Sequence, residues 1–558
     1  MSSPRLRVVL CWHMHQPWYW DPVTERYELP WTYLHAIKDY VDMAAHLEAV
    51  PGARAVFNFT PTLLEQLNDY ESRIGAALAH GADIRDPLLD CLRAQRLPEE
   101  IEARLTLVRA CLRANEQNLI LRFPTYARLA ELARRCLGAP ALCMYLNEQF
   151  MADLLVWYHL AWMGETVRGD PRLRRLLERE SGYTHADRME LLTVIGELIA
   201  GIIPRYRRLA ASGQAELSVT PYAHPIAPLL IDLTAARDAL PDVQLPAAAA
   251  YPGGAERARW HIDKALLVFE HVFGYRPQGC WPAEGGVSGP LLAILDEFGF
   301  KWAATGQGVM GHSVARAGGE SLQACAYRVP GSSVACFYRD DGLSDRIGFT
   351  YAKWHADDAV NDLIAHLHNI KRNLHDPQTS VVPIVLDGEN AWDHYPQNAT
   401  YFLSALYRRL SEDPELELST FSDALRFGVS VQPLPGLVAG SWIYGTFSTW
   451  IGEADKNRAW DWLAQAKQAV DEVFAVGALA TDVRREVEQQ LAICEGSDWF
   501  WWFGPLHARE TVLEFDRLFR HQLLKLYQMI GVRAPDYLQQ PLGAGGSGSG
   551  GAVMLPAN

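Results

Sequence analysis

The stretch "LRVVLCWHMHQP", residues 6–17, decides the fold class, because an apolar run leads without a break into polar residues that can carry chemistry. Residues 6–11 are apolar apart from Arg7, and the run ends in His13 and His15. A short, almost continuous apolar run of this kind predicts a buried strand. Strands that are buried on both faces are typical of parallel sheets covered by helices.

A second stretch, "SVVPIVLDGEN" at residues 380–390, has the same form, and its apolar run ends in Asp387 and Glu389. Two further runs fit, "ARAVFNFTPTLLEQL" and "GFKWAATGQGV", and "AELSVTPYAHPI" is a looser case. Apolar runs that alternate with helical patterns predict an α/β fold built from parallel β/α units. In a β/α barrel the ligand chemistry gathers at the carboxyl ends of the strands, where these polar residues fall.

The chain of 558 residues is longer than a single hydrophobic core usually supports, so more than one domain is expected. We expect a catalytic β/α barrel over residues 1–430, with a helical insertion at about 62–211, where apolar residues recur at helical spacing. A C-terminal helical domain is expected at 431–540. The Gly/Ser-rich end, 541–558, predicts a disordered tail.

The composition predicts a globular protein that binds a neutral or cationic ligand. A net charge of -15 would repel a phosphate backbone, so no nucleic-acid partner is expected. Aromatic residues make up 11% of the chain; their rings stack on sugars, although core filling is their ordinary use. Nine cysteines without a CxxC pair predict reduced thiols and a cytoplasmic location. The longest apolar stretch, residues 191–203, contains a glutamate and is too short for a membrane span.

The stretch "GCWPAEGG", residues 279–286, places Glu284 after a tryptophan and a proline and before two glycines. A lone loop glutamate is ordinarily a solvated surface acid. Here a helical pattern and then a strand pattern follow, so Glu284 lies on a loop that leads into a β/α element. Together with Asp387 at the end of another strand, it supplies the pair of carboxylates that glycoside hydrolysis requires.

Several motifs occur together in an order that resembles glycoside hydrolase family 57. They are "CWHMHQP", "GQAELSVTPYAHPIAPLL", "GCWPAEGG" and "VLDGENAWDHYP", and the resemblance continues through "FYRDDGLSDRIGF", "FSTWIGEADKNRAWDWL" and "GSDWFWWFG". It covers most of residues 6–535. The resemblance implies a retaining enzyme that acts on α-glucans. It also implies an incomplete, seven-stranded β/α barrel with a helical domain that completes the active-site cleft.

The resemblance also assigns roles to residues of this chain. Glu284 matches the nucleophile, and Asp387 matches the general acid/base. Trp281 matches an aromatic residue beside the nucleophile. The other positions expected to contact substrate or to line the cleft are His13, His15, Glu216, His224, Glu389, Trp392, Trp450, Glu453 and Asn457.

The expected mechanism is a double displacement. Glu284 attacks the anomeric carbon while Asp387 gives its proton to the leaving oxygen, and water or a sugar hydroxyl then resolves the ester. Retention requires the two carboxyl groups to lie about 5 to 5.5 Å apart. Asp387 needs a raised pKa, which burial and the charge of Glu284 can supply.

A metal-dependent enzyme is one alternative. His13 and His15 alternate on a strand, so both can face one side and bind a metal ion, as in a polysaccharide deacetylase-like barrel. That alternative predicts loss of activity on chelation. It has no role for the motif around Glu284, and we therefore expect no metal and no other cofactor.

Two further alternatives keep the glucan ligand. The first is a 4-α-glucanotransferase or a branching enzyme, in which a sugar hydroxyl replaces water at the same two carboxylates. The second is a glucan-binding homologue without activity, which retention of both Glu284 and Asp387 disfavours. The stretches "LDGENAWDHYP" and "GSDWFWWFG" most resemble α-amylase and amylopullulanase-type members, which favours hydrolysis. An α-glucan is the expected partner, no membrane partner is expected, and no oligomeric state is predicted.

Overall fold

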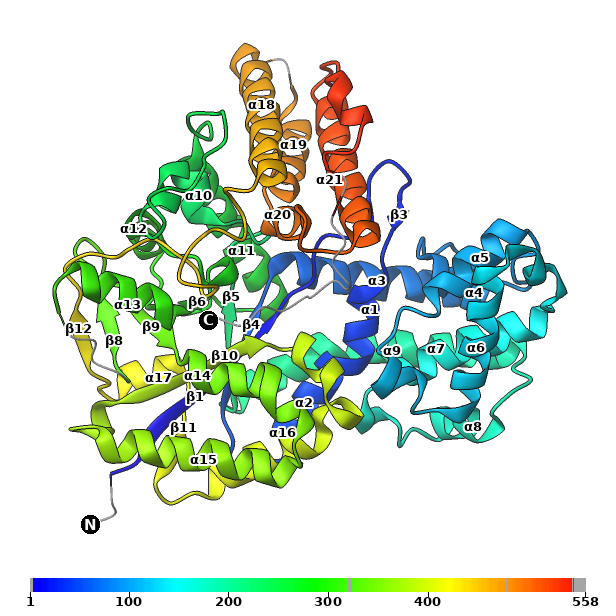
Figure 1. Ribbon diagram of the computed structural model, residues 1–558, viewed down its shortest axis with the longest axis horizontal. Coiled ribbons are helices and arrows are strands. Elements are labelled where there is room, and N and C mark those ends of the chain that lie inside the picture. Colours follow the sequence, from blue (N-terminus) through cyan, green and yellow to red (C-terminus); the bar gives the residue numbers. More distant parts are fainter. Residues whose placement is uncertain (1–3, 320–323, 478, 544, 546–558) are drawn as a thin grey trace.

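The computed structural model describes residues 4–319, 324–477, 479–543 and 545, and its centre is a parallel sheet curled into a barrel (Figure 1). Seven described strands follow one another around the barrel in chain order, and each pairs in parallel with the next from β1 to β9. The last strand, β10, returns to pair with β1. These strands are β1 (Leu6–Met14), β4 (Ala55–Phe59), β5 (Ala215–Val219), β6 (Gly279–Cys280), β7 (Trp302–Gly306), β9 (Ala335–Arg339) and β10 (Val381–Asp387).

The barrel has one seam, between β9 and β10. These two strands form no ladder in the described residues, but the N–H of Asp340 donates to the carbonyl of Pro383 at 2.8 Å. Nε of Arg339 also donates to the carbonyl of Val385 at 2.8 Å. The prediction of an incomplete, seven-stranded β/α barrel is therefore confirmed.

The burial pattern of β1 shows why this sequence forms a strand of the barrel. Val9 and Cys11 face the barrel interior with Trp281 and Trp302, whereas Val8 and its alternate neighbours pack outward in the larger core. Such alternation with both faces buried needs an apolar residue at nearly every position. The strand extends beyond residue 11 to Met14, and its register sets His13 directly beside Asp387 of β10.

Helices and short strands surround the barrel. The helices are α1 (Trp31–His35), α2 (Val41–Glu48), α10 (Ala227–Ile231), α11 (Gly254–Phe273), α12 (Gly289–Glu297), α13 (Gln307–Arg316), α14 (Asp341–Asp345), α15 (Ala356–Asn373), α16 (Thr400–Glu412) and α17 (Phe421–Arg426). The remaining strands are β2 (Trp20–Asp21), β3 (Arg26–Tyr27), β8 (Ala326–Arg328), β11 (Leu416–Leu418) and β12 (Val431–Pro433).

A helical insertion separates β4 from β5 and forms the right-hand part of Figure 1, as predicted. Its centre is α7, which is buried along nearly its whole length. The helices are α3 (Pro61–His80), α4 (Pro87–Arg93), α5 (Ile101–Ala110), α6 (Pro124–Gly138), α7 (Glu148–Trp162), α8 (Pro171–Arg179) and α9 (His185–Ala211).

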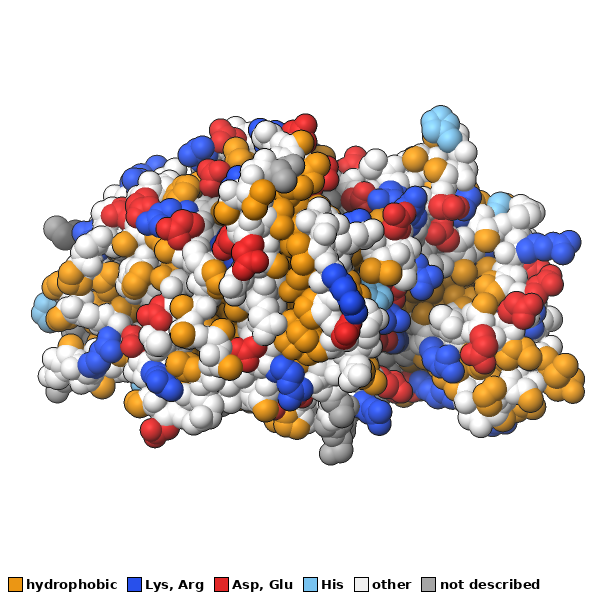
Figure 2. All heavy atoms as spheres, turned by 90° about the horizontal axis from the view of Figure 1, so that it is seen from above, with side chains coloured by type: hydrophobic (Ala, Val, Ile, Leu, Met, Phe, Trp, Pro, Cys, Tyr) orange, Lys and Arg blue, Asp and Glu red, His pale blue; other side chains and the backbone are white. Residues whose placement is uncertain are grey.

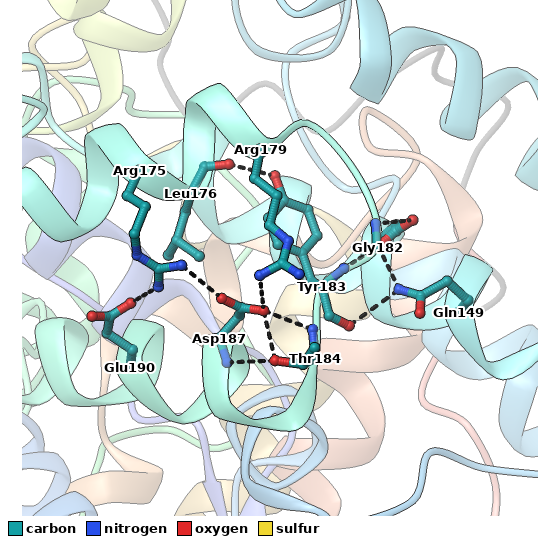
Figure 3. A network of polar contacts seen from close by, with 10 residues as sticks. Gln149, Arg175, Leu176, Arg179, Gly182, Tyr183, Thr184, Asp187 and Glu190 are labelled. Carbon is teal, nitrogen blue, oxygen red and sulfur yellow. Dashed lines mark hydrogen bonds and ion pairs between the residues drawn. The ribbon is translucent and has the colours of Figure 1, made fainter.

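The longest helix of the insertion, α9, begins with a capping box (Figure 3). Oγ1 of Thr184 accepts from the N–H of Asp187 at 3.3 Å, and the Asp187 carboxylate accepts from the N–H of Thr184 at 2.8 Å. Two backbone N–H groups at the helix start are thereby satisfied. Arg175 and Arg179 of α8 bind the same carboxylate, at 3.0 and 2.7 Å, so the cap also joins the two helices.

Four helices near the C-terminus stand over the carboxyl end of the barrel (Figure 1). They are α18 (Ala454–Val476), α19 (Thr481–Cys494), α20 (Ser497–Trp502) and α21 (Arg509–Met529). Figure 2 looks down on this end, where acidic and basic side chains are interspersed. No helix of the described residues is long and apolar enough to cross a membrane. Most of the predicted disordered tail, 541–558, lies outside the described residues. Residues 541–543 and 545 are described, and Leu542 is buried. The domain boundaries stay a prediction.

Candidate active site

A cavity of about 430 Å³ lies at the carboxyl ends of the barrel strands, a size suited to a small-molecule or sugar ligand. Three parts of the chain line it: the barrel, the helical insertion and the helices α20 and α21. The lining residues used below are His13, His15, Trp31, His35, Arg113, Trp162, Glu284, Arg339, Asp387, Glu389, Asp393, Trp442, Asp498 and Glu514.

Glu284 follows β6 in a strained backbone conformation. Its φ of 56° and ψ of 26° lie in the left-handed region, which costs a non-glycine residue roughly 1 to 3 kcal/mol. The backbone carbonyl of Glu284 accepts from the N–H of Trp442 at 3.1 Å, which holds this conformation. Gly285 has a φ of 58°, and a Cβ there would meet the Trp281 ring at 2.9 Å. The turn therefore needs this glycine, and strain of this kind is often found at functional sites.

In the described part of the chain the side chain of Glu284 has one hydrogen bond, from Nε1 of Trp442 to Oε2 at 2.9 Å. Burial raises the pKa of Glu284 to about 8, with further contributions from the charges of Asp387 and Asp498. The hydrogen bond from Trp442 acts in the opposite direction. With this pKa the protonated form of Glu284 predominates at neutral pH.

Asp387 ends β10 and faces the same cavity. Burial raises its pKa, but Nδ2 of Asn390, at 2.9 Å from Oδ2, and the nearby His15 and Arg339 favour the ionised form. Among the described residues Glu284 has one such contact, the hydrogen bond from Trp442. The two carboxyl groups titrate as a coupled pair, and the contacts of Asp387 favour its ionised form more than the single bond from Trp442 favours that of Glu284.

Three histidine rings stack beside the two carboxylates. The rings of His15 and His224 lie 3.8 Å apart, and those of His13 and His224 lie 5.2 Å apart, with planes inclined by about 20°. Burial lowers the pKa of His13 to about 3 and that of His224 well below its usual value, so both rings are neutral.

Every ring nitrogen of the three histidines has a protein partner. Those of His15 are Thr60 at 3.2 Å and Asp498 at 2.7 Å. The other contacts form a chain: His13 Nδ1 to Asn58 Oδ1 (2.7 Å), His13 Nε2 to His224 Nε2 (3.2 Å) and His224 Nδ1 to Ser497 Oγ (2.9 Å). The amide oxygen of Asn58 can only accept, so Nδ1 of neutral His13 carries the ring proton and its Nε2 accepts. His224 therefore donates from Nε2, and its Nδ1 accepts from the Ser497 hydroxyl.

The histidine stack is a poor metal site in this arrangement, although its nitrogens lie within 4.8 Å of one another. A metal ion binds each imidazole in the plane of its ring, and nearly parallel stacked rings cannot direct their lone pairs to one point. The geometry therefore gives no support to the metal-dependent alternative.

Glu389 is a buried acid of the cavity wall. Its Oε1 accepts from the N–H of His15 at 3.1 Å and from Nε2 of Gln16 at 3.3 Å, whereas Oε2 has no hydrogen-bond partner among the described residues. Burial, with the charge of Asp387, raises its pKa well above the usual range. Burial therefore favours the protonated form of Glu389, and its Oε2 is left without a protein partner on a residue that lines the cavity.

Glu216 is not brought to the cavity. It lies near the amino end of β5, where its carboxylate accepts from Nε1 of Trp302 at 2.7 Å and from the N–H of Ser422 at 3.0 Å. These bonds join β5 to β7 and α17. A polar residue early in a strand points away from the carboxyl ends at which the other candidates gather.

Five other predicted residues lie in the packing around the site rather than on its wall. Trp281 packs behind Glu284 against Trp442, with ring centroids 5.2 Å apart. Trp392 and Trp450 are buried in the core. Glu453 caps the N-terminus of α18, and Asn457 accepts a hydrogen bond from the N–H of Gly452. None of these five is among the described residues that line the cavity. His224 is not among them either, but its ring stacks on that of His15, which does line the cavity.

Sequence reasoning missed nine of the lining residues named above, among them Arg339, Trp442 and Asp498. Asp498 lies within the quoted "GSDWFWWFG", where one acid among five aromatic residues was the available signal. Trp442 and Arg339 carried no such signal. Only the fold places the loop around residue 442 against Glu284, and only the fold places the end of β9 next to β10.

Two carboxyl groups that face one cavity are what glycoside hydrolases use to cleave a glycosidic bond. The comparison with protein families agrees: the model of Glycosyl hydrolase family 57 matches residues 9–434. The chain belongs to that family.

Solved structures with the same fold include three enzymes. The branching enzyme from Thermococcus kodakaraensis and the α-amylase from Thermotoga maritima each have a TM-score of 0.56 and 15% identity. The comparisons cover 94% of this chain and 90% of the first enzyme, and 96% of both chains for the second. The 4-α-glucanotransferase from Thermococcus litoralis has a TM-score of 0.51 and 13% identity, over 94% of this chain and 60% of that one. A search of curated proteins found no match.

Proposed function

We propose that the chain is a retaining glycoside hydrolase that cleaves α-glucosidic bonds in starch- or glycogen-type glucans. The observation that carries the proposal is the pair Glu284 and Asp387, which face one cavity and whose charges interact. Membership of Glycosyl hydrolase family 57 supports glycosidic chemistry. The similar α-amylase, branching enzyme and 4-α-glucanotransferase make an α-glucan the first substrate to test.

In the proposed mechanism Glu284 is the nucleophile and Asp387 the general acid/base. The shared proton must first move from Glu284 to Asp387 as substrate fills the cavity. Glu284 then attacks C1, the glycosidic bond breaks, and Asp387 protonates the departing oxygen. In the second half Asp387 takes a proton from water, whose oxygen attacks C1 and releases Glu284. The sugar contacts proposed for this site are Glu389, Asp498 and the histidine stack.

We propose water as the usual acceptor and an α-1,4 bond as the main target, with α-1,6 bonds as a second linkage. This rests on the resemblance of "LDGENAWDHYP" and "GSDWFWWFG" to α-amylase and amylopullulanase-type members. Transfer to a 4-hydroxyl or a 6-hydroxyl is the alternative, since the same two carboxylates serve both reactions.

Products from maltoheptaose, amylose and pullulan separate these reactions. Hydrolysis gives shorter chains and new reducing ends. A 4-α-glucanotransferase gives longer and shorter chains with a constant number of reducing ends, and a branching enzyme creates α-1,6 linkages visible by NMR. Binding of glucan without any change in it would support the inactive homologue and contradict the proposal.

Substitution of the two carboxylates tests their assignment. Glu284→Gln and Asp387→Asn should each lower kcat by at least about a thousandfold, because each removes a group that acts in the transition state. The exposed Glu178→Gln is a matched control that should retain activity. Ordinary turnover in either active-site variant would refute the role given to that residue.

A further inference from the structure

A second cluster of charged side chains borders the cavity, on elements other than those that hold Glu284. Lys38 and Asp39 lie in a single π-helical turn, η1 (Ala36–Tyr40), between α1 and α2. Both are almost completely buried, with exposed fractions of 2% and 0%. Isolated π-turns are frequent at functional sites, and here the turn sets two charges beneath the cavity wall.

The buried charges of the cluster are fully paired. Nζ of Lys38 lies 2.7 Å from Oδ1 of Asp39, 2.7 Å from Oδ1 of Asp393 and 3.1 Å from Oδ1 of Asn398. The other oxygen of Asp39 binds Nδ1 of His35 at 2.7 Å. Buried charges are costly unless they are paired, and these contacts hold His35 and Asp393 in place. The contact of Asp393 with Lys38 is an ion pair only, since Oδ1 has no hydrogen-bond partner among the described residues.

His35 and Asp393 both line the cavity, and each has a polar atom that accepts or donates no hydrogen bond within the described residues. Nδ1 of His35 is hydrogen-bonded to Asp39, and no hydrogen bond from the described part of the chain reaches Nε2 of His35. Lys38 occupies Oδ1 of Asp393, and Oδ2 has no partner in the residues that the structure describes. The Asp393 side chain is 29% exposed. A polar atom in such a place needs water or a ligand to complete its hydrogen bonds.

Aromatic rings complete the surroundings of this cluster. The ring of Trp162 lies 5.6 Å from that of His35, edge to face, and Trp31 lies 5.9 Å from Trp162. Both tryptophans line the cavity. Flat apolar rings beside a hydrogen-bonding acid and an imidazole suit a sugar ring, which has apolar faces and a polar edge.

We propose that His35 and Asp393, oriented by the buried Lys38–Asp39 pair, form a second polar subsite, which binds hydroxyl groups of a glucosyl unit other than the one that is cleaved. The proposal rests on the proposed action on α-glucans. His35 and Asp393 line the same cavity as Glu284, Asp387 and Glu389, so this subsite borders the reactive one. A chain of several units can therefore contact Glu284 and Asp393 at the same time, which makes the cluster a determinant of chain-length preference.

The test measures binding separately from turnover. Maltoheptaose and glucose are titrated calorimetrically into Glu284→Gln, and into Glu284→Gln combined with His35→Ala or with Asp393→Asn. Loss of a hydrogen bond to a neutral sugar should weaken maltoheptaose binding about three- to tenfold. Glucose can occupy the reactive subsite alone, so its affinity should change by less. The matched control is His394→Ala, next to Asp393 but exposed and outside the lining of the cavity.

Kinetics and stability distinguish the subsite from a purely structural role. In the otherwise wild-type chain, His35→Ala should raise KM for maltoheptaose with little change in kcat, because binding is lost equally in ground and transition states. Thermal midpoints of all variants identify any loss of fold, and His35→Gln should restore part of the affinity.

Each outcome has a distinct meaning. Unchanged maltoheptaose affinity in both His35→Ala and Asp393→Asn, or equal losses for glucose and maltoheptaose, would overturn the subsite. Failure of the wild-type chain to bind any maltooligosaccharide would overturn it as well. If the wild-type chain binds maltoheptaose through these residues but cleaves no glucan, the proposed function fails and the subsite stands.

Discussion

At the scale of single residues, the site depends on how two acids share one proton. Asp387 has Asn390, His15 and Arg339 to favour its ionised form, whereas Glu284 has only the hydrogen bond from Trp442. These contacts favour the proton on Glu284, which is the residue that must attack as an anion. Entry of the sugar must reverse this order, and Trp442 is the group that already favours the reactive form of Glu284.

The pH dependence of kcat/KM follows from this pair. Activity requires one proton on the pair, so it should fall at low pH, where Asp387 and Glu284 are both protonated. It should also fall above about pH 8, where Glu284 loses the last proton and no acid remains. A profile of kcat/KM on maltoheptaose reports these ionisations of the free enzyme.

Trp442→Phe is the variant that tests the cause of the alkaline limb. It removes the hydrogen bond that lowers the pKa of Glu284, so the alkaline limb should move to higher pH. An alkaline limb that stays in place, or that moves to lower pH, would contradict this account of the shared proton.

At the scale of elements, the barrel strands were predictable because they are apolar at nearly every position. The polar residues at the ends of β1 and β10 were predictable for the same reason, since a buried run must stop where the chain reaches the cavity. Glu216 shows the limit: its motif resembled a sugar-binding region, but its place on β5 depends on where that strand begins. No short pattern fixes that boundary.

The start of α9 gives a prediction about stability. Thr184→Ala removes the side-chain half of the capping box and should lower the free energy of unfolding by about 1 kcal/mol. Chemical denaturation followed by circular dichroism measures the change. Ser181→Ala, on the exposed turn just before the helix, is the control and should have little effect. Equal stability of Thr184→Ala and the wild-type chain would show that Arg175 and Arg179 hold Asp187 without the cap.

At the scale of the whole molecule, the cavity belongs to three distant parts of the chain. Arg113 of the insertion binds the Glu514 carboxylate of α21, and Asp498 of α20 binds His15 of the barrel. These contacts span about 400 and 480 residues of sequence. Local patterns predicted the barrel, the insertion and the C-terminal helices separately, but they could not predict which side chains meet where those parts join.

Trapping of the covalent intermediate tests the central claim most directly. An α-glucosyl fluoride needs little acid assistance to leave, so Asp387→Asn should still form the glycosyl ester and then resolve it slowly for want of a general base. Mass spectrometry of the proteolysed variant should find one glucosyl unit on the peptide that contains Glu284, and none in the double variant with Glu284→Gln. An adduct on another residue, or turnover with inversion at the anomeric carbon and no adduct, would contradict the account.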